Sequence, residues 1–314
     1  MVPAMATPSD IAASALSRAV LALEGLSTGD AFGQCFFDPA VEAFRQERKV
    51  PDGPWHYTDD TEMSLSVVDV LARHDRIEQD DLAKSIAGRY SYDRAYGPSM
   101  HRVLAEIRGG RDWRVATRAV FEGQGSYGNG AAMRAAPVGA YFAGDRARIL
   151  EQAALSAEVT HAHPEAIAGS IAVALAADLA CRLREGREDI EPASFIDAVL
   201  QDVPDGEVRS RLRRARDIRG TASRGHAAAI LGCGIAMSAP DTVPYALWCA
   251  ATLLRDYESA LWLAIDAGGD RDTLAAIVGG IVACRVGWEG IPVDWRSRRE
   301  PWPAFGKEWP FESG

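Results

Sequence analysis

Apolar residues recur along this chain mostly at the spacing of helices. In the stretch from Ile11 to Leu23, apolar side chains fall at Leu16, Val20 and Leu23, the i, i+4, i+7 spacing of one helix face. A stretch near the other end repeats the helical pattern without a break at Leu274, Ile277, Val278, Ile281 and Val282. Alanine and leucine dominate, and alternation of β-branched residues is scarce. The pattern therefore predicts an all-α protein.

Residues typical of helix ends support this interpretation. Pro164 stands where proline is tolerated at the start of a helix, and Glu165 follows in the expected first turn. Asp241 is predicted to be the N-cap of a further helix that runs through Leu254.

The segments between the expected helices are short and contain proline and glycine, without repeats or a Ser/Gly-rich hinge. We therefore expect a single compact domain over residues 1–314. After Gly287 the composition changes, and we expect an irregular C-terminal tail over residues 288–314. Its indoles should anchor it on the helices, although an aromatic platform for a ligand is an alternative. They are Trp288, Trp295, Trp302 and Trp309.

Composition narrows the choice of function. The chain has 314 residues, 47% of them hydrophobic, and a net charge of −10 from 34 basic and 44 acidic residues. The acidic balance argues against general nucleic-acid binding but not against a small anionic ligand. The five cysteines are dispersed without a CxxC pair, which is typical of reduced thiols in the cytoplasm. The sequence shows no signal peptide and no membrane span, so we expect a cytoplasmic protein.

Two acidic motifs carry the clearest chemical signal. Each combines carboxylates with a threonine hydroxyl just before an apolar helical pattern, and these oxygens are ligands suited to Mg²⁺ or Mn²⁺. Four carboxylates that converge repel each other unless cations lie between them, so two metal ions are the natural interpretation. Helix capping is the alternative. It would explain one aspartate of the first motif but not the whole cluster, and in the second motif Thr273 or Asp272 could be the capping residue. The motifs are Tyr57-Thr58-Asp59-Asp60-Thr61-Glu62 and Gly268-Gly269-Asp270-Arg271-Asp272-Thr273.

Two further features are weaker signals. A glycine-rich stretch over residues 123–130 leads into a predicted helix from Ala131, where exposed backbone N–H groups can bind phosphate, although a plain loop fits as well. His161 and His163 form a His-x-His pair, for which packing at a helix start or a hydrogen bond to a ligand is a better explanation than metal binding. No Gly-x-Ser-x-Gly motif supports acyl transfer.

Taken together, these residues resemble the ADP-ribosylglycohydrolases. The resemblance spans nearly the whole chain, because five matching stretches follow one another in the order of the family. They are residues 25–33 (Gly-Leu-Ser-Thr-Gly-Asp-Ala-Phe-Gly), 57–63, 127–137, 160–167 and 260–278.

The resemblance implies a compact orthogonal helical bundle with two Mg²⁺ or Mn²⁺ ions in a central cleft. Asp30 would stand near that cleft, in a structural role or in direct contact, and Asp59 or Asp60 could accept a proton from water. The metal ligands implied by the family are Thr58, Asp59, Asp60, Asp270, Asp272 and Thr273. The implied substrate-binding residues are Ser126, Tyr127, Gly128, Asn129, Gly130, Met133 and His161.

Two positions depart from the family pattern. Many relatives have a glutamate where this chain has Phe37, which leaves the general base open. Arg271 replaces a residue that is usually threonine, and its side chain need not face the metals.

The expected function is hydrolysis of the glycosidic bond that joins ADP-ribose to an acceptor, with ADP-ribose as the product and the chain acting as a monomer. The sequence leaves the acceptor linkage open. An inactive ADP-ribose-binding or structural member of the family is one alternative. A magnesium-dependent isoprenoid-type synthase is another, but its aspartate motifs would lie in the middle of helices.

Overall fold

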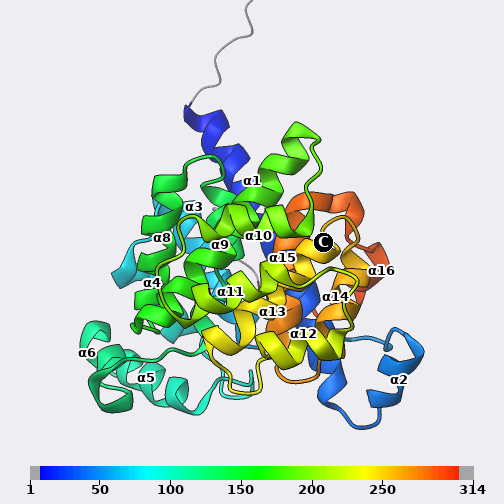
Figure 1. Ribbon diagram of the computed structural model, residues 1–314. Coiled ribbons are helices and arrows are strands. Elements are labelled where there is room, and N and C mark those ends of the chain that lie inside the picture. Colours follow the sequence, from blue (N-terminus) through cyan, green and yellow to red (C-terminus); the bar gives the residue numbers. More distant parts are fainter. Residues whose placement is uncertain (1–7, 304–314) are drawn as a thin grey trace, which may run out of the picture.

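The computed structural model describes residues 8–303, and this part of the chain contains sixteen α-helices and no β-strand (Figure 1). The expectation of an all-α fold is confirmed. The helices are α1 (Pro8–Gln34), α2 (Glu42–Glu47), α3 (Asp59–His74), α4 (Gln79–Arg89), α5 (Pro98–Arg108), α6 (Trp113–Arg118), α7 (Ala136–Tyr141), α8 (Arg146–Glu158), α9 (Pro164–Gly186), α10 (Pro192–Leu200), α11 (Glu207–Asp217), α12 (Arg224–Leu231), α13 (Ala239–Thr252), α14 (Tyr257–Asp266), α15 (Arg271–Val286) and α16 (Val293–Arg298). Four 3-10 turns are η1 (Cys35–Phe37), η2 (Phe121–Gly123), η3 (Asn129–Ala131) and η4 (Trp288–Gly290).

Glycines allow α1 and α15 to approach each other at backbone distance. Gly25, Gly29 and Gly33 lie one turn apart on α1 and face α15. A Cβ atom built on Gly29 would lie 2.2 Å from the carbonyl oxygen of Ala275, and one on Gly33 would lie 2.4 Å from that of Arg271. No side chain larger than hydrogen fits at such distances. The two helices therefore run side by side in opposite directions, and the end of α1 lies against the start of α15.

Helix α9 begins at Pro164, as predicted, and contacts α7, α8, α13 and α15. It lies near the middle of the bundle, with α8, α13 and α15 around it in Figure 1. Its N-cap is His163, whose Nδ1 accepts a hydrogen bond from the backbone N–H of Glu165 at 3.1 Å. By length and composition α9 could cross a membrane, but 89% of its most apolar window is buried inside the fold. It has the burial of a core helix.

The prediction that Asp241 caps a helix is wrong. Helix α13 starts three residues earlier, with Ser238 at the N-cap and Ala239 as its first residue. Pro240 occupies the first turn, where its missing N–H has no cost. Asp241 lies inside that turn, and its carboxylate accepts a hydrogen bond from the backbone N–H of Ala236 at 2.9 Å.

The C-terminal segment is more regular than expected. Residues 288–303 contain η4 and the short helix α16, where we predicted an irregular tail. The anchoring role of its indoles is confirmed for two of them. Trp295 is 2% exposed and stacks on Phe32 with 4.4 Å between ring centroids, and the Nε1–H of Trp302 donates to Ser27 Oγ at 3.0 Å. Trp309 lies outside the described residues.

The glycine contact between α1 and α15 can be tested by adding one methyl group. We expect Gly29→Ala to lower the free energy of unfolding by about 3 kcal/mol or more, because the new Cβ would meet the backbone of Ala275. The matched control is Gly88→Ala in α4, where nothing lies within 4 Å of the added Cβ. That change should be neutral or stabilising by about 0.5 kcal/mol. Denaturant unfolding of both variants measures the difference, and equal stabilities would contradict the close contact.

Candidate metal centre and adjoining cavity

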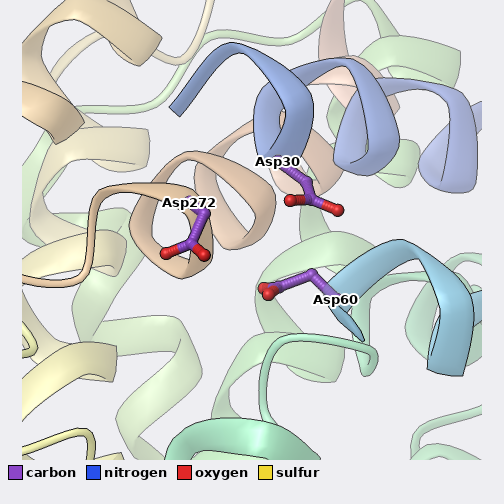
Figure 2. A group of neighbouring side chains, drawn as sticks. All are labelled: Asp30, Asp60 and Asp272. Carbon is purple, nitrogen blue, oxygen red and sulfur yellow. The ribbon is translucent and has the colours of Figure 1, made fainter. Parts of the chain in front are cut away.

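Three helices bring an aspartate each to one point in the core. Asp30 comes from the end of α1, Asp60 from the first turn of α3 and Asp272 from the first turn of α15. Their side chains point toward one another (Figure 2), and one oxygen of each lies within 4.8 Å of the others. All three are buried. Residues 242 positions apart in the chain, Asp30 and Asp272, thus contribute to the same acidic centre.

The start of α3 combines a helix cap with the acidic centre. Thr58 is the N-cap, and its Oγ1 accepts from the backbone N–H of Asp60 at 3.4 Å. Capping therefore accounts for the threonine but not for the two aspartates. Thr58 Oγ1 and Thr273 Oγ1 both lie near Asp60 Oδ2, at 3.0 and 3.4 Å, whereas Asp60 Oδ1 is buried without any hydrogen-bond partner. An unpaired buried carboxylate oxygen is costly unless a cation or donor meets it.

Asp30 ties α1 to the start of α3. Its carboxylate accepts hydrogen bonds from four donors, the backbone N–H and the hydroxyl of both Thr58 and Thr61, at 2.6–3.2 Å. These donors use the acceptor capacity of both oxygens. Of the two roles left open for Asp30, the structure favours the structural one, in which Asp30 places Thr58 and the residues that follow it.

The second acidic motif follows a tight glycine turn. Gly268 and Gly269 have φ angles of 73° and 65°, in the left-handed region that glycine adopts without strain. Asp270 is the N-cap residue of α15, although no side chain caps this helix by a hydrogen bond, and Asp270 Oδ2 accepts from Asn129 Nδ2 at 2.6 Å. Asp272 Oδ1 accepts from the backbone N–H of Thr273 at 2.9 Å. Helix capping by Thr273 or Asp272 is therefore not what this motif does.

Arg271 points away from the acidic centre. Its guanidinium donates to the carbonyl oxygen of Phe36, lies 3.4 Å from a carboxylate oxygen of Glu42 and stands 5.7 Å from the ring of Phe37. The departure from the family pattern at this position thus leaves the carboxylate set unchanged.

The acidic centre is electrostatically unfavourable by itself. Burial, reinforced by the neighbouring carboxylates, raises the pKa values of Asp59, Asp60 and Asp272 well above their ordinary range. Burial also raises the pKa of Asp30 to about 6, and it raises that of Asp270. Either protons or cations relieve this repulsion. The donors are all carboxylate or hydroxyl oxygens, and one of them is unpaired, so the residues fit Mg²⁺ or Mn²⁺.

A cavity of about 270 Å³ opens beside the acidic centre. Four of the predicted metal ligands line it, namely Asp59, Asp270, Asp272 and Thr273, while Thr58 and Asp60 lie buried behind them. All seven predicted substrate-binding residues line the same cavity: Ser126, Tyr127, Gly128, Asn129, Gly130, Met133 and His161. The structure therefore brings together at one cavity residues that the sequence separates by up to 214 positions.

Other parts of the cavity wall had no signal in the sequence. Met100, Phe121, Met237 and Ser238 contribute to it from segments without a recognisable motif. The tryptophans of the described C-terminal segment do not, so the alternative of a tail platform for this cavity is not supported.

We had expected the glycine-rich stretch to lead directly into an α-helix at Ala131, and this prediction is wrong. It leads into the three-residue turn η3, and α7 begins only at Ala136, beside Pro137. The stretch instead crosses the segment before α13, where the backbone N–H groups of Asn129 and Ala239 donate to Met237 and Tyr127 carbonyls at 3.2 and 3.0 Å. Any phosphate contact here depends on loop backbone and side chains rather than on a helix dipole.

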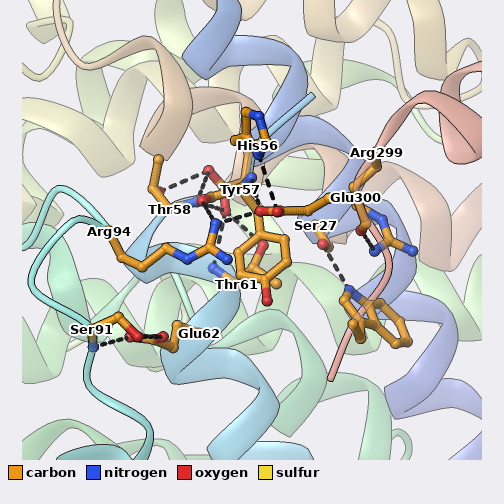
Figure 3. Close-up of polar contacts among 12 residues, drawn as sticks. Ser27, His56, Tyr57, Thr58, Thr61, Glu62, Ser91, Arg94, Arg299 and Glu300 are labelled. Atoms are coloured by element: carbon orange, nitrogen blue, oxygen red, sulfur yellow. Dashed lines mark hydrogen bonds and ion pairs between the residues drawn. The ribbon is translucent and has the colours of Figure 1, made fainter. Parts of the chain in front are cut away.

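A second set of residues holds the backbone that carries the first acidic motif (Figure 3). Glu300 Oε1 accepts from the backbone N–H of Tyr57 at 3.1 Å and pairs with Arg94, while its Oε2 lies 3.1 Å from His56 Nδ1. Arg94 in turn donates to the carbonyl oxygen of Tyr57 at 2.7 Å, and its own carbonyl accepts from Asp59 N–H at 2.8 Å. Glu300 lies some 240 positions from this motif, so sequence reasoning missed it.

Glu62, the last acid of the first motif, faces away from the metal ligands. It accepts hydrogen bonds from the backbone and hydroxyl of Ser91, at 3.0 and 2.8 Å, and from the hydroxyl of Tyr96 at 2.8 Å. It therefore holds the segment after α4 against the start of α3.

Comparison with known proteins identifies the family to which these residues are similar. A model of the family described as "ADP-ribosylglycohydrolase" matches residues 12–309. The chain is 31% identical to ADP-ribosylhydrolase ARH3 of Homo sapiens, over 78% of this chain and 75% of that protein. It is 27% identical to the ADP-ribosyl-[dinitrogen reductase] glycohydrolase of Rhodospirillum rubrum, over 90% of both. A solved structure titled "ADP-ribosylglycohydrolase-related protein complex" has the same fold, with a TM-score of 0.62 and 23% identity over 92% and 94% of the two chains.

The acidic centre predicts that removal of one carboxylate has opposite effects on stability with and without metal. Folding raises the pKa of Asp60 above its unfolded value near 3.8, so this carboxyl stabilises the fold at low pH and loses that contribution as pH rises. In EDTA, Asp60→Asn should therefore melt above the unsubstituted protein, by a larger margin at pH 7 than at pH 4.5. With Mg²⁺ or Mn²⁺ the order should reverse, because binding to the folded state stabilises it. Thermal melts test this, with exposed Asp205→Asn as the control for loss of one charge, and a margin independent of both pH and metal would contradict it.

Glu300 predicts an effect on metal affinity from outside the ligand set. Glu300→Ala should weaken Mn²⁺ binding by about tenfold or more, because the backbone at Tyr57 and Arg94 loses its shared acceptor. Glu300→Gln keeps an oxygen for Tyr57 N–H and should lose less. Calorimetric titration with Mn²⁺ compares the two with Glu106→Ala, which breaks an ion pair with Arg111 remote from the site. Equal affinities for all three variants would exclude the bracing role.

Proposed function

The chain belongs to the ADP-ribosylglycohydrolase family, and we propose that it is a metal-dependent hydrolase that cleaves the glycosidic bond between ADP-ribose and an acceptor. Its relatives are glycosyl hydrolases whose names state that they act on ADP-ribosylated substrates. One observation carries the proposal: a buried set of oxygen ligands with an unpaired oxygen on Asp60 opens onto a cavity lined by every predicted substrate-binding residue.

The ligand set suits two Mg²⁺ or Mn²⁺ ions held by the six predicted residues from α3 and α15. When bound, the ions supply positive charge that offsets the carboxylates and polarises substrate oxygens. The remaining work falls to the chain itself. The glycine-rich stretch and His161 line the same cavity as the acids and can bind and orient the ADP-ribose part of the substrate, with its anomeric carbon beside the acids.

Asp59 is the residue that we assign to proton transfer. It lines the cavity, whereas Asp60 lies behind it, so Asp59 can approach a water molecule that attacks the anomeric carbon. Phe37 strengthens this choice, because its ring is 46% exposed outside the cavity wall and has no group that accepts a proton. Where many relatives have a glutamate, this chain therefore relies on an aspartate of the metal centre.

The alternatives receive less support. An isoprenoid-type synthase would need its aspartates in the middle of helices, whereas Asp60 and Asp272 lie in first turns. An inactive reader of ADP-ribose would not need the complete set of six ligand residues that this chain retains. We propose a monomeric hydrolase that works in the cytoplasm, where its five free cysteines stay reduced.

Release of free ADP-ribose tests the proposal and identifies the acceptor. Arginine-, serine-, nucleobase- and ester-linked ADP-ribose should be compared in Mg²⁺, Mn²⁺ or EDTA. We expect release from at least one linkage in the presence of metal and none in EDTA. Asp60→Ala and Asp272→Ala should lower turnover by about 100-fold or more, because both remove carboxylate from the metal centre.

Asp197→Ala, on the exposed side of α10, controls for loss of an acidic residue and should keep full activity. Circular dichroism should show that all variants stay folded. Retained turnover in both core variants would refute the assignment of the centre. ADP-ribose binding without release from any linkage would favour the reader.

A further inference from the structure

A fully buried arginine connects the glycine-rich stretch to His161. The Arg134 side chain is 0% exposed. Its Nη1 donates to the carbonyl oxygen of Gly130 at 2.8 Å, and its Nη2 donates to the Ser156 carbonyl at 2.6 Å and to Thr160 Oγ1 at 2.9 Å. A guanidinium has no acceptor atom, so the direction of each of these bonds is fixed.

The bond from Arg134 determines what Thr160 can do. Thr160 is fully buried, and its hydroxyl oxygen already accepts from the guanidinium. The hydroxyl has one proton to donate, and its one remaining hydrogen-bond partner within residues 8–303 is His161 Nδ1 at 2.7 Å. If Nδ1 itself carried a proton, the hydroxyl proton would be buried without an acceptor, which is strongly disfavoured. Nδ1 is therefore the acceptor, and the ring proton of His161 resides on Nε2.

The ring of His161 lies between the cavity and the glycine-rich stretch. The ring lies against two glycines of the loop, and a Cβ atom built on Gly130 would lie 2.6 Å from Cε1 and 2.9 Å from Nε2. His161 lines the cavity, and no residue in the described part of the chain forms a hydrogen bond with its Nε2. Burial, together with the positive charge of Arg134, lowers the pKa of His161 to about 3, so the ring is neutral at physiological pH.

We infer that Arg134 and Thr160 are positioning residues that hold His161 in the Nε2–H tautomer and direct this N–H at an oxygen of the bound ligand. The hydrogen bond from Arg134 to the Gly130 carbonyl keeps the loop against the imidazole ring. The hydrogen bond from Thr160 determines which ring nitrogen of His161 carries the proton. A neutral donor of this kind recognises a hydroxyl or phosphate oxygen and rejects a ligand group that is itself only a donor. The identity of the ligand as ADP-ribose rests on the proposed function. The hydrogen bonds that link Arg134, Thr160 and His161 do not depend on it.

The tautomer can be observed directly, without ligand or turnover. A long-range ¹H–¹⁵N spectrum at pH 7 separates protonated from unprotonated ring nitrogens, and the chain has only six histidines. Loss of one signal set in His161→Gln assigns the residue. We expect a protonated Nε2 and an unprotonated, hydrogen-bonded Nδ1. A protonated Nδ1 would overturn the inference.

Substitution of Thr160 tests whether the hydroxyl matters for binding. Thr160→Val removes the hydroxyl at similar volume and should raise the Kd for ADP-ribose about three- to tenfold, with a shift of the Nδ1 resonance as its hydrogen bond is lost. Thr160→Ser keeps the hydroxyl and should stay within about twofold of the unsubstituted protein. Calorimetry with ADP-ribose and Mg²⁺ measures both. Equal affinities and unshifted Nδ1 signals in the two variants would overturn the positioning role.

The two hypotheses fail in different ways. If the unsubstituted protein does not bind ADP-ribose, the proposed function fails, and the spectrum of His161 still decides the tautomer. If Thr160→Val does not fold, the spectrum of the unsubstituted protein decides the inference by itself. Gly130→Ala provides a further check, because its added Cβ should displace the ring and weaken ADP-ribose binding while the Nε2–H tautomer remains.

Discussion

The backbone contact between α1 and α15 is the constraint on which the rest of the structure depends. Glycines on α1 bring its end against the start of α15, and this places Asp30 near Asp272. Asp30 then holds Thr58 and Thr61 by hydrogen bonds, so the start of α3 is positioned by the same contact. The acidic centre is thus built from three helix ends whose relative placement depends on the absence of side chains at a few positions.

Without cations, the buried carboxylates of this centre destabilise the folded state, and the surrounding residues hold the centre in place by hydrogen bonds. Buried carboxylates with raised pKa values repel each other in the absence of cations. Hydroxyl and backbone donors meet Asp30, while Glu300 and Arg94 hold the Tyr57 backbone on both sides. None of these groups forms a hydrogen bond with Asp60 Oδ1, which stays without a partner in the described part of the chain. The repulsion is therefore confined to one site, where bound cations can remove it.

Sequence reasoning was strong where the signal is local and weak where it is not. Helical periodicity and the two acidic motifs predicted α1, α3, α9 and α15, because each depends on neighbours in the chain. The residues of the glycine-rich stretch and His161, which line the cavity, were implied by the family resemblance. The cap at Asp241 was wrong because the helix starts before it, with Ser238 at the N-cap and Pro240 in the first turn. Glu300 and the glycine contacts of α1 could not be predicted, because their partners lie more than 200 positions away. Arg134 stood within a matched stretch, yet only its complete burial reveals that it holds the loop and Thr160 together.

Two groups of residues that line the cavity differ in chemistry, and this difference bears on how a substrate would bind. One group presents the carboxylates of Asp59, Asp270 and Asp272, which repel the phosphates of an anionic substrate in a chain whose net charge is already −10. The other group presents the glycine-rich backbone and the Nε2–H of His161, which attract phosphate or hydroxyl oxygens. Asn129 joins the two groups through its hydrogen bonds to Asp270 and Thr242. Cations between these carboxylates would remove the repulsion, so the proposed metal ions would favour substrate binding as well as the chemical step.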